Sequence, residues 1–141
     1  MLIEIVKYPD KLPVIRYIRD DGTVVWQSVT PFFVLHDLAH YALEKVLGFR
    51  SAFLGLVNQG IHPKDFEEAE KRKAIILTAE AWNAENSVNL FLTELSQGEW
   101  DDFNLVAAAA YAQQNNPTTY RPLSSAEVSS IRQKIRELFQ E

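Results

Sequence analysis

The sequence predicts an α+β fold, with a short antiparallel three-stranded β-meander over residues 1–29 and about four to five helices forming a small bundle over residues 30–141. Short runs of branched and aromatic residues fill the first of these regions, as is typical of strands. From residue 30 onward the apolar residues recur at intervals of three and four, as is typical of helices. A length of 141 residues suits one hydrophobic core, so residues 1–141 are expected to form a single domain.

Three segments predict the strands of the meander, residues 2–6, 14–18 and 23–29. The turn Asp20-Asp21-Gly22 separates the second from the third. Because Asp-Gly tolerates the positive φ of a tight hairpin, this pairing is the most strongly indicated local contact. Trp26 in the third segment is expected to anchor the core, as are Trp82 and Trp100.

The first helix is predicted to begin after Thr30, since Thr-Pro supplies an N-cap followed by a proline at the first helical position. Gly48 is expected to end it. A second, short helix is predicted over residues 51–59, with Ser51 as its N-cap and Gly60 as its stop. The chain then turns at residues 61–63.

The second half of the chain predicts three longer helical regions. Residues 65–97 are helical in character, but a single helix of that length would span ~50 Å, so a break is expected near residues 70–73. Apolar residues between positions 77 and 95 share one stripe, which predicts the central core helix. An alanine-rich helix over 103–114 follows, and a last helix opens with the capping box of Ser124 and Glu127.

Composition excludes several classes of function. The formal net charge is −5, so repulsion from phosphates argues against a nucleic-acid partner. There is no cysteine, which rules out disulfides, thiolate nucleophiles and cysteine-ligated metals. No apolar run reaches the ~18 residues that cross a bilayer, and the first residues lack a signal-peptide pattern, so we expect a cytoplasmic location and no membrane partner.

The segment His36-Asp37-Leu38-Ala39-His40 carries the strongest chemical signal. Histidines at positions i and i+4 project from one helical face, the spacing at which zinc enzymes present two imidazoles to one ion. His36 and His40 are therefore predicted to bind a divalent metal such as zinc. Asp37 stands where such enzymes carry a general-base glutamate, and its shorter side chain would act either as that catalytic base or as a group that orients a ligand.

The third ligand is expected to come from another element. Glu80, on the shoulder of the central helix stripe, is the first candidate, and His62, in a turn that could fold back, is the second. Glu44 lies eight residues after His36, ~12 Å along a helix axis, so it is expected to pair with His40 instead.

A second interpretation makes the two histidines structural, hydrogen-bonded at the edge of the core. The chain would then be a non-enzymatic interaction or assembly domain, such as a homodimer or other homo-oligomer. The apolar face of Phe53, Leu54 and Val57, or the alanine-rich helix, would bury against a second copy.

The pattern F-F-x-x-H-D-L-x-H-Y at residues 32–41, with G-F-R at 48–50 and F-x-G-L-V at 53–57, resembles an uncharacterised group of small bacterial proteins. The likeness covers mainly residues 30–60, with a looser match in the meander and the last helix. It implies a bacterial, cytoplasmic setting and carries no function.

Overall fold

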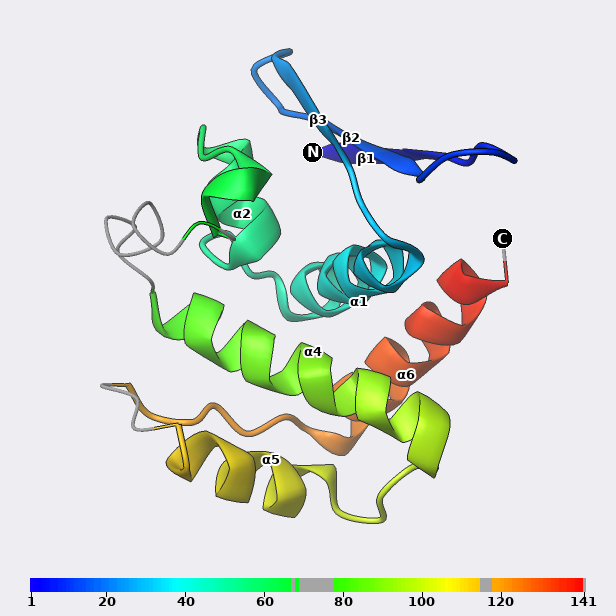
Figure 1. Ribbon diagram of the computed structural model, residues 1–141. Helices are drawn as coiled ribbons and strands as arrows, with labels where there is room; N and C mark the ends of the chain where they lie inside the picture. Colours follow the sequence, from blue (N-terminus) through cyan, green and yellow to red (C-terminus); the bar gives the residue numbers. More distant parts are fainter. Residues whose placement is uncertain (67, 69–77, 115–117, 141) are drawn as a thin grey trace.

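The structure is a computed structural model that describes residues 1–66, 68, 78–114 and 118–140. A three-stranded antiparallel sheet comes first and helices follow, so the predicted α+β fold is confirmed (Figure 1). The strands are β1 (Leu2–Val6), β2 (Val14–Ile18) and β3 (Val24–Ser28). The helices are α1 (Pro31–Leu47), α2 (Phe53–Asn58), the 3₁₀ helix η1 (Pro63–Phe66), α4 (Ala79–Gln97), α5 (Phe103–Ala112) and α6 (Ser125–Phe139).

The sheet is a meander in the order β1-β2-β3. Gly22 adopts φ 88°, and the carboxylate of Asp21 accepts a 2.9 Å hydrogen bond from the backbone N–H of Thr23, so the predicted hairpin turn is confirmed. Ile15 and Tyr17 are fully buried on the inner face. Trp26 points to the other side and is 60% exposed, so the prediction that it anchors the core is wrong.

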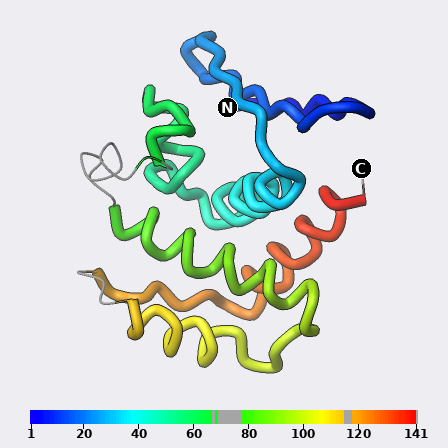
Figure 2. Tube along the Cα trace, in the orientation of Figure 1, coloured from blue at the N-terminus to red at the C-terminus, as the bar shows by residue number. Residues whose placement is uncertain are grey.

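Helix α1 lies between the sheet and α4, with α6 beside it and α5 on the far side of α4 (Figures 1 and 2). It contributes to both apolar cores. Val34 packs in the cluster under the sheet, whereas Ala39, Ala42 and Leu43 belong to the cluster shared with α4, α5 and α6. Leu35 on the same helix belongs to neither cluster and is 38% exposed.

The ends of α1 follow the sequence closely. Pro31 occupies the first turn after Thr30, and Gly48 closes the helix in the left-handed conformation at φ 69°. Helix α2 differs from the prediction, because Ala52 holds the N-cap position and Ser51 instead donates its hydroxyl to Glu80 at 3.0 Å.

Helix α4 begins at Ala79, where the Thr78 hydroxyl accepts a 3.0 Å hydrogen bond from the N–H of Ala81. The break expected near residues 70–73 lies outside the described residues. In α6 both hydrogen bonds of the capping box between Ser124 and Glu127 are present, as predicted. Within the described part of the chain, no helix is both long enough and apolar enough to cross a bilayer.

Leu35 and Leu43, two of the leucines on α1, provide a matched test of this packing. Leu43 is fully buried in the cluster that α1 shares with α4, α5 and α6, whereas Leu35 is 38% exposed. Leu43→Ala is expected to lower the free energy of unfolding by about 2–5 kcal/mol, because it removes buried methyl groups and leaves a cavity. Leu35→Ala should change it by less than about 1 kcal/mol. Denaturant unfolding of both variants checks this, and equal losses would contradict the orientation of α1.

Candidate metal centre

His36 and His40 lie one turn apart on α1, with ring centroids 4.6 Å apart. Both rings direct Nε2 toward one carboxylate, that of Glu85 on α4. His36 Nε2 is 3.4 Å from Glu85 Oε1, and His40 Nε2 is 3.0 Å from Glu85 Oε2. The helices that carry these groups share a core cluster containing Ala39 and Ala84, whose small side chains permit close approach of α1 and α4. The three side chains therefore converge across one helix–helix contact.

The other nitrogen of each ring is held by a second carboxylate. His36 Nδ1 lies 3.2 Å from Asp37 Oδ1, and His40 Nδ1 lies 3.0 Å from Glu44 Oε2. Both of these carboxylates are buried. A carboxylate on Nδ1 fixes the orientation of the ring and leaves Nε2 as the atom that faces a ligand. The Nδ1 side of each ring is thus held by its own carboxylate, and the Nε2 sides of both rings face Glu85.

The orienting carboxylates are anchored in other elements of the fold. Asp37 accepts a short hydrogen bond from the hydroxyl of Tyr17 on β2, and that hydroxyl accepts a 3.2 Å bond from the amide of Gln27 on β3. Glu44 accepts 3.2 Å hydrogen bonds from the backbone N–H groups of Leu54 and Gly55 in the first turn of α2. The sheet therefore holds one ring and α2 holds the other.

Close backbone packing explains why Gly55 stands at this point. A Cβ at position 55 would lie 2.1 Å from the carbonyl oxygen of Arg50, a contact that no side chain can make. The glycine lets the start of α2 approach the preceding loop and present two N–H groups to Glu44.

The carboxylates control the protonation of both rings. Burial lowers the pKa of His40, but its hydrogen bonds to Glu44 and Glu85 raise the pKa by more, to about 10. Burial also lowers the pKa of His36, and its bonds to Asp37 and Glu85 again outweigh that effect and raise the pKa. For Glu85, burial raises the pKa, whereas the two imidazoles lower it well below the ordinary value. Without a metal, the His40 ring is therefore held as an imidazolium ion at neutral pH, and the same contacts favour the protonated form of His36.

The structure sorts the residues predicted from sequence into three groups. His36 and His40 lie together as predicted, and Glu44 pairs with His40 as predicted. Asp37 occupies the orienting position behind His36, not the Nε2 side where a metal-bound water would lie. Glu80 lies elsewhere, because its carboxylate accepts hydrogen bonds from the backbone N–H groups of Arg50 and Ser51 as well as the Ser51 hydroxyl.

Two further points concern the third ligand. His62 lies in the turn before η1, where its Nδ1 accepts a 3.1 Å hydrogen bond from the N–H of Lys64. Glu85, which the sequence analysis missed, takes the position proposed for Glu80. Both glutamates flank the buried stripe of α4, and Glu85 follows the buried Ala81 by four residues. Only the packing of α4 on α1 decides which of the two glutamates faces the histidines, and the local sequence does not predict that packing.

The His36–His40–Glu85 group has the dimensions of a metal site. One ligand atom from each of the three residues lies within 4.8 Å of the others. Ligands bound tetrahedrally to zinc at about 2.0–2.1 Å lie about 3.3 Å from one another. The two nitrogen–oxygen separations, 3.4 Å to Oε1 and 3.0 Å to Oε2 of Glu85, are of similar size but run to different oxygens of that carboxylate. Phe53 packs against both rings at centroid distances of 6.4 and 5.2 Å, and the Glu85 side chain is 52% exposed. The Phe53 ring thus covers the two imidazoles on one side, and the Glu85 side chain is the part of the group most exposed to solvent.

The chain matches no protein-family model, no curated protein and no solved structure. The structure shows an α+β protein, and among its described side chains is a His-His-Glu group that could hold a metal ion. That group joins α1 to α4, and its two orienting carboxylates join it to the sheet and to α2.

The raised pKa values make the stability of the metal-free protein depend on pH. A group whose pKa is higher in the folded state stabilises it fully below the unfolded value, and that stabilisation is lost as pH rises through the folded value. For His40 these values are 6.5 and about 10. In the presence of a chelator, the free-energy difference between the native chain and His40→Gln should therefore shrink as pH rises from 6.5 to about 10. A difference that stays constant or grows over this range would contradict the imidazolium network.

Proposed function

We propose that this chain is a divalent-metal-binding domain in which the Nε2 atoms of His36 and His40 and the carboxylate of Glu85 hold a zinc-like ion. The observation that carries the proposal is that the two nitrogens of each ring have different partners. Both Nε2 atoms meet at one partly exposed carboxylate, while both Nδ1 atoms are held by separate, buried carboxylates. Histidine ligands in metal proteins are oriented in this way.

The charges of the side chains around the two rings also favour the binding of a divalent cation. With neutral rings, the carboxylates of Asp37, Glu44 and Glu85 bring a charge of −3 into a largely buried region. Uncompensated charge of this kind is costly away from water. Two protons on the rings reduce it to −1, and one divalent ion on neutral rings does the same. A metal can therefore replace two protons without changing the net charge of the centre.

Three protein ligands leave one position of a tetrahedral ion open. Two histidines and a glutamate are the ligand set of several zinc hydrolases, in which water fills that position and is activated as the nucleophile. Hydrolysis is accordingly the reaction class we assign to the centre. Asp37 uses both carboxylate oxygens on Tyr17 and His36, so it serves as the orienting residue and the activated water depends on the metal.

Assembly with a second copy is the competing function. Leu54 and Val57 are buried under the sheet, so the face suggested for that role by the sequence is already covered. Leu105 on α5 is 70% exposed and favours self-association through the alanine-rich helix. Under this alternative the histidine network is structural and remains protonated. The solution mass of the native chain and of Leu105→Glu separates the two functions, since only assembly predicts a mass that falls in the variant.

Metal content provides the direct test. Protein purified without a histidine tag and dialysed against zinc should retain about one ion per chain, and Glu85→Gln should lose most of it because the third ligand becomes a neutral amide. Glu80→Gln is the matched control. It changes the same residue type on the same helix, and it should leave the metal content unchanged because Glu80 bonds the loop at residues 50–51. Elemental analysis of the variants gives the result.

The His36→Ala/His40→Ala double variant completes this experiment. It should contain no metal and should fold with reduced stability, because the two apolar cores remain while Glu44 and Glu85 lose their imidazole partner. Equal and negligible zinc in the native chain and the double variant would refute a metal site. Equal zinc in native, Glu80→Gln and Glu85→Gln proteins would refute the assignment of the third ligand.

Tyr17 tests the orienting network separately from the ligands. Tyr17→Phe removes the hydroxyl that holds Asp37 while keeping the ring in the core. Loss of such an outer partner is expected to weaken zinc binding about 10- to 100-fold. Tyr41→Phe is the matched control, since the described partner of the Tyr41 hydroxyl is Lys45 and not the centre. Competition titration with a chromogenic chelator measures both affinities, and equal affinities would contradict the role of Tyr17.

A further inference from the structure

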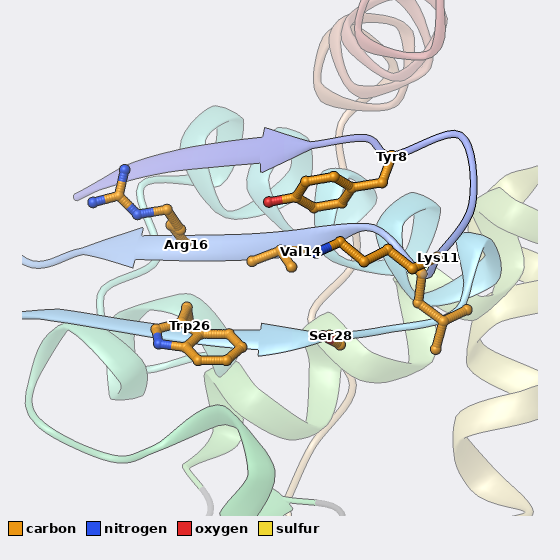
Figure 3. A pocket seen from close by; sticks show the side chains of 7 residues that line it. Tyr8, Lys11, Val14, Arg16, Trp26 and Ser28 are labelled. Atoms are coloured by element: carbon orange, nitrogen blue, oxygen red, sulfur yellow. The ribbon is translucent and has the colours of Figure 1, made fainter.

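The outer face of the sheet is hollowed at a place separate from the histidine centre. A hollow of about 610 Å³ lies over the strands and the loop after β1. It is lined by Tyr8, Lys11, Leu12, Val14, Arg16, Trp26 and Ser28. Figure 3 shows Tyr8 and Lys11 reaching from that loop back over the strands, with Trp26 on β3 across from them. The hollow is open to solvent, and its volume falls within the range of about 300–1,000 Å³ that small-molecule sites occupy.

Two aromatic rings, those of Tyr8 and Trp26, line the hollow although it faces solvent. Trp26 is 60% exposed and Tyr8 is 38% exposed. The uncovered face of an antiparallel sheet normally carries polar residues. An exposed tryptophan in a concave surface offers a flat apolar area on which a planar ring can stack. The site therefore favours a ligand with an aromatic ring.

The charges around the hollow favour a single negative group on that ligand. The ammonium of Lys11 lies 4.1 Å from the centre of the Tyr8 ring. Among the described residues, no carboxylate lies within salt-bridge distance of this ammonium. Arg16 is already paired with Glu4 at 2.7 Å, so it contributes hydrogen-bond donors with its charge largely balanced. The Lys11 ammonium is therefore available to contact an anionic group beside the two rings.

We propose that this hollow binds a small planar anion, an aromatic ring system that carries one phosphate or carboxylate group. The ring stacks on Trp26, and the acidic group contacts Lys11. A polyanion such as a nucleic acid fits less well, because the chain carries a net charge of −5 and the hollow offers one unpaired cation. The proposal is independent of the metal centre, since Tyr17 and Arg16 project from opposite faces of β2.

Pairs of probes that differ only in charge test the proposal. Adenosine monophosphate is compared with adenosine, and indole-3-acetate with indole, by titration into ¹⁵N-labelled full-length protein followed by NMR. At least one anion should give saturable shifts at the amides of residues 8–16 and 26–28, with a Kd of about 1 mM or tighter. Its neutral partner should bind at least about tenfold more weakly. The two arms show which of these anions, the adenine phosphate or the indole carboxylate, the site takes.

Variants separate this site from general effects. Lys11→Ala and Trp26→Leu should each weaken the anion about tenfold or more. Lys7→Ala is the matched control, because it removes the same charge from the same loop at a position that does not line the hollow. The proposal is overturned if no probe saturates, if shifts map to α1 and α4, if Lys7→Ala loses as much affinity as Lys11→Ala, or if the shifts follow protein concentration, which would assign the face to a second copy.

Discussion

The pairing of a fully buried imidazole with two carboxylates joins α1, α2 and α4 in this protein. His40 is 1% exposed and lies 3.0 Å from both Glu44 and Glu85. Glu44 in turn accepts two backbone N–H groups from α2, and Glu85 belongs to α4. The ring on α1 therefore fixes where α2 and α4 can lie. A buried carboxylate left without its partner would be costly, so the three helices must meet in this way.

The same logic extends to the sheet and explains polar residues in its inner face. Gln27 and Tyr17 are buried among branched side chains, and their polar atoms lead to Asp37 and on to His36. What the polar pair adds is a fixed orientation for one imidazole, transmitted from β3 through β2 to α1. The β-meander thus supports the centre as well as covering one side of α1.

Local rules predicted much of the fold, and non-local packing decided the rest. The hairpin at Gly22, the ends of α1 and the capping box of α6 depend on a few neighbouring residues, and each is present as predicted. The His36–His40 pair follows from helical spacing in the same way. The third acidic group did not follow, since Glu80 and Glu85 border the same stripe and only the approach of α4 to α1 selects between them. Trp26 was misplaced because an alternating strand does not report which of its faces is covered.

The relation between the centre and the apolar cores distinguishes a functional metal from a structural one. Structural zinc sites are closed by four protein ligands and often supply the energy that folds a small domain. Here the described chain already has two apolar clusters, one under the sheet and one among α1, α4, α5 and α6. The His-His-Glu group offers three side chains that could hold an ion at the margin of those clusters, with the Glu85 side chain half exposed. Because protons can occupy the centre in place of a metal, the fold does not require the ion, and an ion bound there would keep a coordination position for chemistry.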